Sequence, residues 1–124
     1  MDTIPSLNSD PFMDIETCVN RLLAEYRKHK NLIIAIDFDD TVFDFHGRGR
    51  RYDLVLDALK RCSDLGFYMM LFTGGQPSDY HWQKSYLAQH GIHIHSVNEN
   101  PIDLPFGNHG KPYFNLLLDD RAGL

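Results

Sequence analysis

Short apolar runs alternate with amphipathic stretches along this chain, and this alternation predicts its secondary structure. The continuous apolar run at residues 32–37, LIIAID, is typical of a strand that is buried on both faces of a parallel sheet. Further strands are predicted at residues 67–73, 92–97 and 113–120. The chain therefore carries about four strands, of which the first is expected to be the central one.

Three helical stretches precede or separate these strands, because their apolar residues recur at helical spacing. They cover residues 10–30, 53–65 and 78–90, with Asp53 as the expected N-cap of the second helix and Gly66 as its stop. Strands that alternate with helices of this length form right-handed crossovers around a parallel sheet. The predicted fold class is α/β, a Rossmann-like three-layer sandwich with a mainly parallel sheet.

The length and composition fit one domain over residues 1–124. A hydrophobic content of 43% suffices for a single core without disulfides. Residues 1–31 would form an N-terminal helical extension, and residues 32–124 would form the core that carries any catalytic site. The apolar stripe of the extension suggests that it covers a face or an edge of the sheet.

The overall charge and the N-terminal sequence limit the partners of the protein. A formal net charge of -5 gives no global attraction to nucleic acid or to an anionic membrane, so phosphate recognition must be local. The sequence MDTIPSLNSDPF lacks the basic and apolar regions of a signal peptide, and no apolar run approaches the ~18 residues of a membrane span. We expect a soluble, cytoplasmic protein without a membrane partner.

Acidic residues are concentrated where two of the predicted strands end. Asp37, Asp39 and Asp40 close the central strand, and Asp119 and Asp120 close the last one. Ligands of parallel sheets bind beyond the carboxyl ends of the strands. If the two strands are neighbours, unit charges ~4 Å apart repel by ~4 kcal/mol at an effective dielectric near 20, so a cation is needed. Carboxylate ligands suit magnesium. If these aspartates were only solvated loop residues, their concentration at two strand ends would be unexplained.

The sequence DFDDT at residues 37–41 resembles the DxDx[T/V] signature of haloacid dehalogenase (HAD) superfamily phosphatases. Thr73 at the end of the second strand and the sequence LLLDDR at residues 116–121 follow in the order that the family uses. The resemblance covers residues from about 32 to 121 and extends to a VNEN turn at residues 97–100. The gaps after the first two strands are too short for a cap domain, so the resemblance implies a small, stand-alone, capless member.

The resemblance implies a magnesium-dependent phosphohydrolase that cleaves a phosphate monoester through an aspartyl-phosphate intermediate. Asp37 would be the nucleophile, and Asp39 would protonate the leaving oxygen and then activate the hydrolytic water. Carboxylates two residues apart in an extended segment project to the same side, as this division of labour requires. Thr73, with backbone N–H groups at Gly74 and Gly75, would bind the phosphoryl oxygens.

The lysine of the third family motif is assigned to Lys111, which lies just before the last strand in GKPYFNLLLDD, while Lys84 remains a rival. The resemblance implies that Mg²⁺ is held at the strand ends, and it leaves open whether the first or the second aspartate of LLLDD is the direct ligand. The implied metal-binding residues are Asp37, Asp39, Asp119 and Asp120.

Two features bear on the substrate. Asp40 stands where many family members have Gly or Asn. The turn HGRGRRY places Arg48, Arg50 and Arg51 on what would be the family's flap beside the site, where Arg48 and Arg50 are predicted to contact substrate phosphate or sugar. Plain solvated charges are the alternative. An open site fits a phosphorylated small molecule, an exposed phosphate on a larger molecule, or a homo-oligomer that supplies a lid. Nucleic-acid ends remain an alternative that is not favoured.

A catalytically weak phosphate-binding module or a receiver-like regulatory domain is the competing function. A receiver domain places its phosphorylated Asp on a middle strand, before Thr and Lys, whereas here Asp37 opens the series and the last aspartates follow Lys111. A module without turnover has no need of Asp39. The motif order thus favours an enzyme, and both alternatives remain open.

Overall fold

The computed structural model describes residues 15–102 and 112–120. Within these ranges, no helix has the length and apolar character needed to cross a lipid bilayer. The elements in chain order are α1 (Ile15–His29), β1 (Ile33–Ile36), α2 (Tyr52–Asp64), β2 (Tyr68–Leu71), the 3₁₀ helix η2 (Pro77–Asp79), α3 (Tyr80–Gln89), β3 (Ser96–Val97) and β4 (Leu116–Leu118).

The chain divides into two compact units, residues 1–31 and residues 32–124. The boundary falls where the sequence separates the helical extension from the core. In the first unit, α1 carries Glu16 in its first turn and basic residues in its last turn, an order that complements the helix dipole. Coverage of the sheet by this helix stays a prediction.

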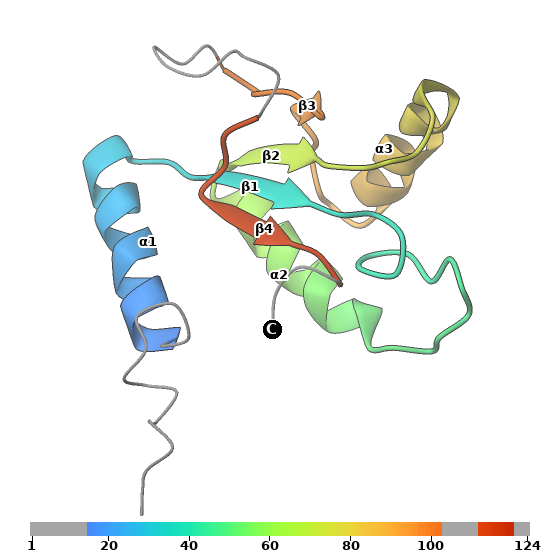
Figure 1. Ribbon diagram of the computed structural model, residues 1–124, viewed down its shortest axis with the longest axis horizontal. Helices are drawn as coiled ribbons and strands as arrows, with labels where there is room; N and C mark the ends of the chain where they lie inside the picture. The colour runs from blue at the N-terminus through green and yellow to red at the C-terminus, as the bar shows by residue number, and fades with distance from the viewer. Residues whose placement is uncertain (1–14, 103–111, 121–124) are drawn as a thin grey trace, which may run out of the picture. The chain divides into compact units, whose positions relative to one another are not determined.

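The second unit is built on a four-stranded, fully parallel sheet with strand order β3-β2-β1-β4 (Figure 1). In this register, Ile36 at the end of β1 pairs with Leu71 of β2 and with Leu118 of β4. The predicted α/β fold class, the parallel sheet and the central place of the first strand are confirmed. The order reverses at β1, because β2 and β3 lie on one side of it and β4 on the other. The carboxyl ends of β1 and β4 are therefore the switch point at which such sheets bind ligands.

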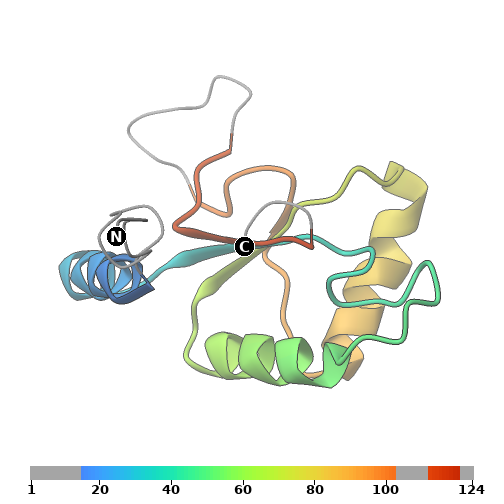
Figure 2. The ribbon, with the colours of Figure 1, turned by 60° about the horizontal axis from the view of Figure 1, so that its bottom comes forward.

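Side chains of β1 alternate between two apolar clusters, one on each face of the sheet. Ile34 and Ile36 join the larger cluster, together with Leu56 and Leu59 of α2 and Leu87 of α3. Figure 2 shows both helices on the same side of the sheet. The opposite face carries a smaller cluster, whose fully buried members are Ile33, Ala35 and Met70. All of β1 is buried, as predicted for a strand covered on both faces. The third layer of the sandwich stays a prediction.

The prediction of Asp53 as N-cap of the second helix was wrong. The helix begins at Tyr52, and Arg51 occupies the cap position without a side-chain hydrogen bond. The Asp53 carboxylate lies in the first turn, where it accepts hydrogen bonds from the Arg51 guanidinium at 3.1 Å. The predicted stop is confirmed, since Gly66 adopts a left-handed φ of 82° just beyond the last turn and donates its N–H to the Ser63 carbonyl.

The strand that was predicted over residues 92–97 is shorter in the structure, where β3 contains two residues. The reason is the side chain of His95. The ring Nδ1 of His95 accepts the Met69 backbone N–H at 3.0 Å, and the backbone N–H of His95 donates to the Met69 carbonyl at 2.8 Å. A ring nitrogen thus takes the place of a ladder carbonyl, while Ile92 and Ile94 still pack into the core.

This arrangement makes stability depend on the protonation of His95. Burial, together with the charge of His93, holds the pKa of His95 below its ordinary value of 6.5. The folded state therefore binds its proton less readily than the unfolded state, and stability falls as pH decreases below about 6.5. A His95→Gln variant, which does not titrate, should lose less melting temperature between pH 7.5 and pH 5.5 than wild type in thermal denaturation. Parallel pH profiles for the two proteins would contradict this account.

Candidate functional site

Three carboxylates meet at the carboxyl ends of β1 and β4. Asp37 follows β1 directly, and its backbone N–H donates to the Leu118 carbonyl of β4 at 2.8 Å. Asp119 and Asp120 follow β4. One carboxylate oxygen from each aspartate lies within 4.8 Å of the other two, so these residues form a group that could hold a metal ion. We call Asp37, Asp119 and Asp120 the acidic triad.

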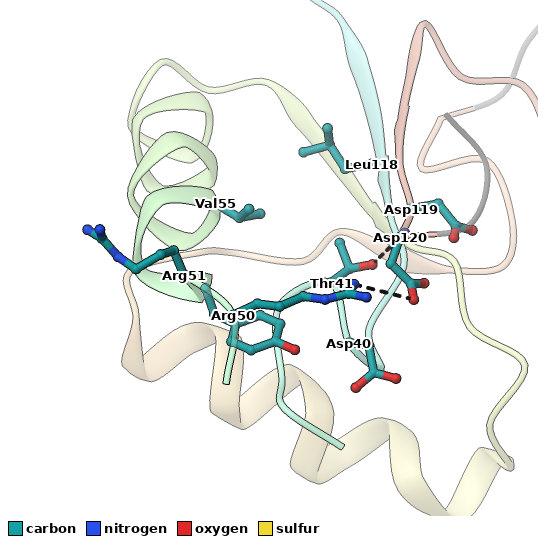
Figure 3. Close-up of a pocket in the computed structure, with 9 residues that line it drawn as sticks. Asp40, Thr41, Arg50, Arg51, Val55, Leu118, Asp119 and Asp120 are labelled. Atoms are coloured by element: carbon teal, nitrogen blue, oxygen red, sulfur yellow. Dashed lines mark hydrogen bonds and ion pairs between the residues drawn. The ribbon is translucent and has the colours of Figure 1, made fainter. Parts of the chain in front are cut away.

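The hydroxyl of Thr41 connects the two strand ends of the triad. It donates to the Asp37 carboxylate at 3.0 Å. It also accepts the Asp120 backbone N–H at 3.0 Å, as Figure 3 shows. Thr41 is buried. In the sequence, Thr41 is the last residue of the DFDDT signature, and that pattern predicted no role for it. The residue type could have indicated this bridging role, because a hydroxyl group can donate one hydrogen bond and accept another at the same time.

The electrostatics of the triad call for a cation. Burial, reinforced by the charges of Asp119 and Asp120, raises the pKa of Asp37 from its ordinary 3.8 to about 6, although the hydrogen bond from Thr41 opposes this rise. Ionising all three carboxylates is therefore costly in the protein by itself. A hard divalent ion with oxygen ligands would relieve the repulsion, so the donor set fits Mg²⁺. Asp37, Asp119 and Asp120 are the side chains that would hold it.

The Asp39 carboxylate is not part of the triad. Residue 39 forms an isolated bridge with Phe43, beyond the end of β1. Burial, followed by the charge of Asp40, raises the pKa of the Asp39 carboxyl, and Asp79 acts in the same direction. A carboxyl that holds its proton more readily suits a proton donor. Its assigned roles in metal binding and proton transfer stay predictions.

The turn after β2 is held in place by Asn98. Its side chain accepts the Thr73 N–H and donates to the Thr73 carbonyl, both at 2.8 Å. Asn98 has a left-handed φ of 56° and donates its own N–H to the Leu71 carbonyl. The Thr73 hydroxyl accepts the Gly75 N–H at 3.1 Å. The sequence pattern predicted no role for the VNEN turn at residues 97–100. In the structure, its first Asn, Asn98, holds the backbone of the Thr73 turn.

Gly75 lies closer to its neighbours than Gly74 does. A Cβ atom at residue 75 would lie 3.3 Å from the Thr73 hydroxyl and 3.5 Å from the Gln83 amide nitrogen, whereas a Cβ at Gly74 would have nothing within 4 Å. Gln83 is buried at 3% exposure, and its Oε1 has no partner among the described residues. The second glycine is therefore the one that the packing of this turn requires.

Arg48 and Arg50 both reach carboxylates near the triad. The Arg50 guanidinium lies 3.8 Å from Asp120, and the Arg48 Nε lies 3.6 Å from Asp40. Figure 3 shows Arg50 extending toward Asp120. Both residues line a pocket of about 250 Å³. The pocket is lined by Asp40, Thr41, Arg50, Arg51, Tyr52, Val55, Leu118, Asp119 and Asp120. The flap arginines thus face the strand ends.

The two lysine candidates have different standing in the structure. Lys111 lies outside the described residues, so its predicted role stays a prediction. Lys84 lies in the middle of α3 with an exposed side chain, and within the described part of the chain no contact joins it to the triad. The geometry gives Lys84 no support as the motif lysine.

Comparisons with known proteins bear on the fold. No protein-family model matches the chain, and no curated protein matches it. Among solved structures, the chain is similar to one of a conserved protein from Bacteroides thetaiotaomicron, with a TM-score of 0.58 and 22% sequence identity. The similarity covers 73% of this chain and 77% of that chain. At this identity the likeness shows the fold alone.

Replacing the Asp37 carboxylate should change stability in a pH-dependent way. Because the folded pKa of about 6 lies above the unfolded 3.8, ionising Asp37 costs stability as pH rises through that interval. In EDTA, the melting temperature of Asp37→Asn minus that of wild type should therefore grow from pH 4 to pH 7. Mg²⁺ should reduce this difference at pH 7. A difference that is flat with pH would contradict the repulsion inferred for the triad.

Proposed function

We propose that this protein is a magnesium-dependent phosphohydrolase that cleaves a phosphate monoester, with Asp37 as the nucleophile. The observation that supports this proposal most is the acidic triad. Three carboxylates whose oxygens lie within 4.8 Å of one another stand at the switch point of a parallel sheet. The order of DFDDT, Thr73 and the final aspartates, which resembles that of HAD superfamily phosphatases, supports the same reaction.

The proposed reaction has two steps. In the first, an Asp37 oxygen attacks phosphorus, the bond from phosphorus to the leaving oxygen breaks, and that oxygen takes a proton from Asp39. In the second, Asp39 removes a proton from water, the water oxygen attacks the phosphorus of the aspartyl phosphate, and the bond from phosphorus to the Asp37 oxygen breaks. Inorganic phosphate leaves, and the Asp37 carboxylate is restored.

The metal and the surrounding side chains have separate tasks in this proposal. Mg²⁺, held by Asp37, Asp119 and Asp120, would offset the negative charge of the carboxylates and of the phosphoryl group. The Thr73 turn, fixed by Asn98, would bind phosphoryl oxygens through the Thr73 hydroxyl proton and the Gly74 N–H, because the N–H groups of Thr73 and Gly75 already bond within the protein. These groups are set before substrate arrives, which lowers the cost of organising them in the transition state.

Phosphate release from p-nitrophenyl phosphate and from a panel of sugar phosphates and nucleotides tests the activity. Wild type should require Mg²⁺, and Asp37→Asn should lose activity by roughly a thousandfold or more, because the nucleophile is gone. Asp64→Asn is the matched control, since it removes an exposed carboxylate that pairs with Lys60 on α2. If wild type binds Mg²⁺ yet releases no phosphate from any substrate, a phosphate-binding or receiver-like module becomes the better account.

The two glycines of the turn give a second test. In Gly75→Ala, the new Cβ would crowd the Thr73 hydroxyl at 3.3 Å, so this hydroxyl must shift by a few tenths of an ångström and kcat/KM should fall by roughly tenfold. Gly74→Ala meets nothing within 4 Å and should keep most of the activity. Circular dichroism would verify that both variants fold. Equal losses in the two variants would argue against a positioning role for this turn.

A further inference from the structure

Asp40 is a buried carboxylate to which the proposed reaction assigns no role. It is 4% exposed and lies beside the triad, between Asp39 and Thr41. Its backbone has a left-handed φ of 61°, a conformation that costs energy for a residue with a side chain. A buried charge in an unfavourable backbone conformation calls for strong compensation from its surroundings.

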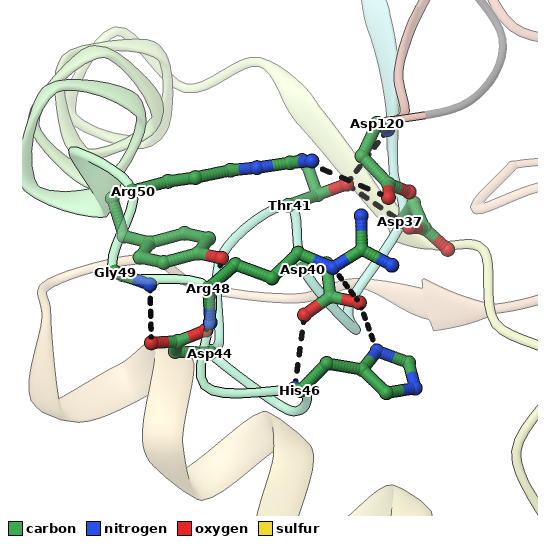
Figure 4. Close-up of polar contacts among 10 residues, drawn as sticks. Asp37, Asp40, Thr41, Asp44, His46, Arg48, Gly49, Arg50 and Asp120 are labelled. Atoms are coloured by element: carbon green, nitrogen blue, oxygen red, sulfur yellow. Dashed lines mark hydrogen bonds and ion pairs between the residues drawn. The ribbon is translucent and has the colours of Figure 1, made fainter.

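Within the described part of the chain, the compensation comes from the flap, which we define as residues 44–50. The Asp40 carboxylate accepts the His46 backbone N–H at 3.1 Å, contacts the His46 ring nitrogen Nδ1, and lies 3.6 Å from the Arg48 Nε (Figure 4). Although burial opposes ionisation of Asp40, the hydrogen bonds and charges of His46 and Arg48 hold its pKa below the ordinary value. Asp40 therefore fastens the middle of the flap to the loop that follows β1.

A second carboxylate, that of Asp44, forms hydrogen bonds within the flap. Asp44 accepts the Arg48 N–H at 2.6 Å and the Gly49 N–H at 3.0 Å, and the Tyr52 hydroxyl donates to the same carboxylate at 3.2 Å. Gly47 and Gly49 have φ values of 67° and 68°, which only glycine adopts without strain. The flap thus has a defined conformation without any helix or strand.

The position of the flap determines where its cations lie. From the fixed flap, Arg50 reaches Asp120 of the triad at 3.8 Å, and Arg48 lies over Asp40. Each guanidinium has five N–H donors, and these ion pairs use only part of them. The triad and the Thr73 turn already serve the phosphoryl group that is transferred. The guanidinium donors are therefore suited to a different group of the substrate.

We propose that Asp40 is a positioning residue, which holds the flap so that Arg48 and Arg50 select substrates with a second anionic group beside the phosphate that is cleaved. The selection of substrates rests on the proposed phosphohydrolase function, whereas the fixing of the flap by Asp40 does not. Arginine suits this role, because its planar guanidinium binds phosphate or carboxylate oxygens in pairs.

Limited proteolysis with trypsin tests the fixing of the flap without any need for activity. The flap arginines are cleavage sites, so Asp40→Asn should be cut after Arg48 and Arg50 roughly tenfold faster than wild type, since a charge-assisted anchor is lost. Cleavage after Lys84 in α3 reports global unfolding and should not change. Asn tolerates a left-handed φ, and Asp40→Gly serves as a second variant that removes the side chain without backbone strain.

Two proteolysis results would overturn the proposal. One is an unchanged rate of cleavage in the flap for both variants. The other is an equal acceleration at Lys84, which would mean that Asp40 supports overall stability only. The Asp64→Asn variant, which alters an exposed ion pair on α2, controls for the loss of a carboxylate and should match wild type.

Steady-state kinetics test the selection of substrates. The ratio of kcat/KM for a sugar bisphosphate to that for p-nitrophenyl phosphate should fall roughly tenfold in Asp40→Asn, mainly through KM. Arg48→Ala should reproduce this fall and add little in the Asp40→Asn background, because both changes remove the same interaction. An unchanged ratio, in protein whose flap is cleaved faster, would overturn the recognition role. Absence of any phosphatase activity in wild type would instead count against the proposed function.

Discussion

β4 pairs with β1 in parallel register, and this pairing brings the three carboxylates of the triad to one edge of the sheet. The hydrogen bond from Asp37 to Leu118 and the bridge through the Thr41 hydroxyl continue the pairing beyond the last residues of the strands. At a separation of about 5 Å and an effective dielectric near 20, each pair of unit charges repels by about 3 kcal/mol. The sheet thus holds together groups that would separate by themselves.

Several features around the triad offset this concentration of negative charge. Asp37 holds its proton up to a pH of about 6, and Arg50 lies beside Asp120. Asp40, which adds another carboxylate next to the site, is instead paired with His46 and Arg48 of the flap. The charges of the flap therefore balance the acidic loop in the free protein and are well placed to meet an anionic substrate.

The sequence predicts the parts of this structure that depend on periodic patterns. The buried run LIIAID identified the central strand, and the position of the aspartates after two strands identified the edge of the sheet where they meet. Neither inference requires knowledge of which distant residues touch, because a parallel sheet places the carboxyl ends of its paired strands at the same end.

Features that depend on single side chains bonding to distant backbone could not be predicted in this way. His95 replaces a ladder carbonyl beside Met69, and Asn98 clamps the backbone of Thr73 across 25 residues of sequence. Asp53 binds Arg51 rather than capping its helix, although its residue type favours a cap. Such bonds form because the fold brings two distant segments together. The residue type alone does not determine which partner a side chain will bond to.

The most direct test of the account is to trap the phosphoryl group on Asp37. In Asp39→Asn, p-nitrophenyl phosphate can still phosphorylate Asp37, because its leaving group needs no proton, while the hydrolytic water lacks its base. After rapid acid quench, peptide mass spectrometry should find one phosphoryl group on Asp37, and Asp37→Asn should carry none. Release of phosphate by wild type with no phosphorylated Asp37 in the trapping variant, or with the label on another residue, would contradict the account.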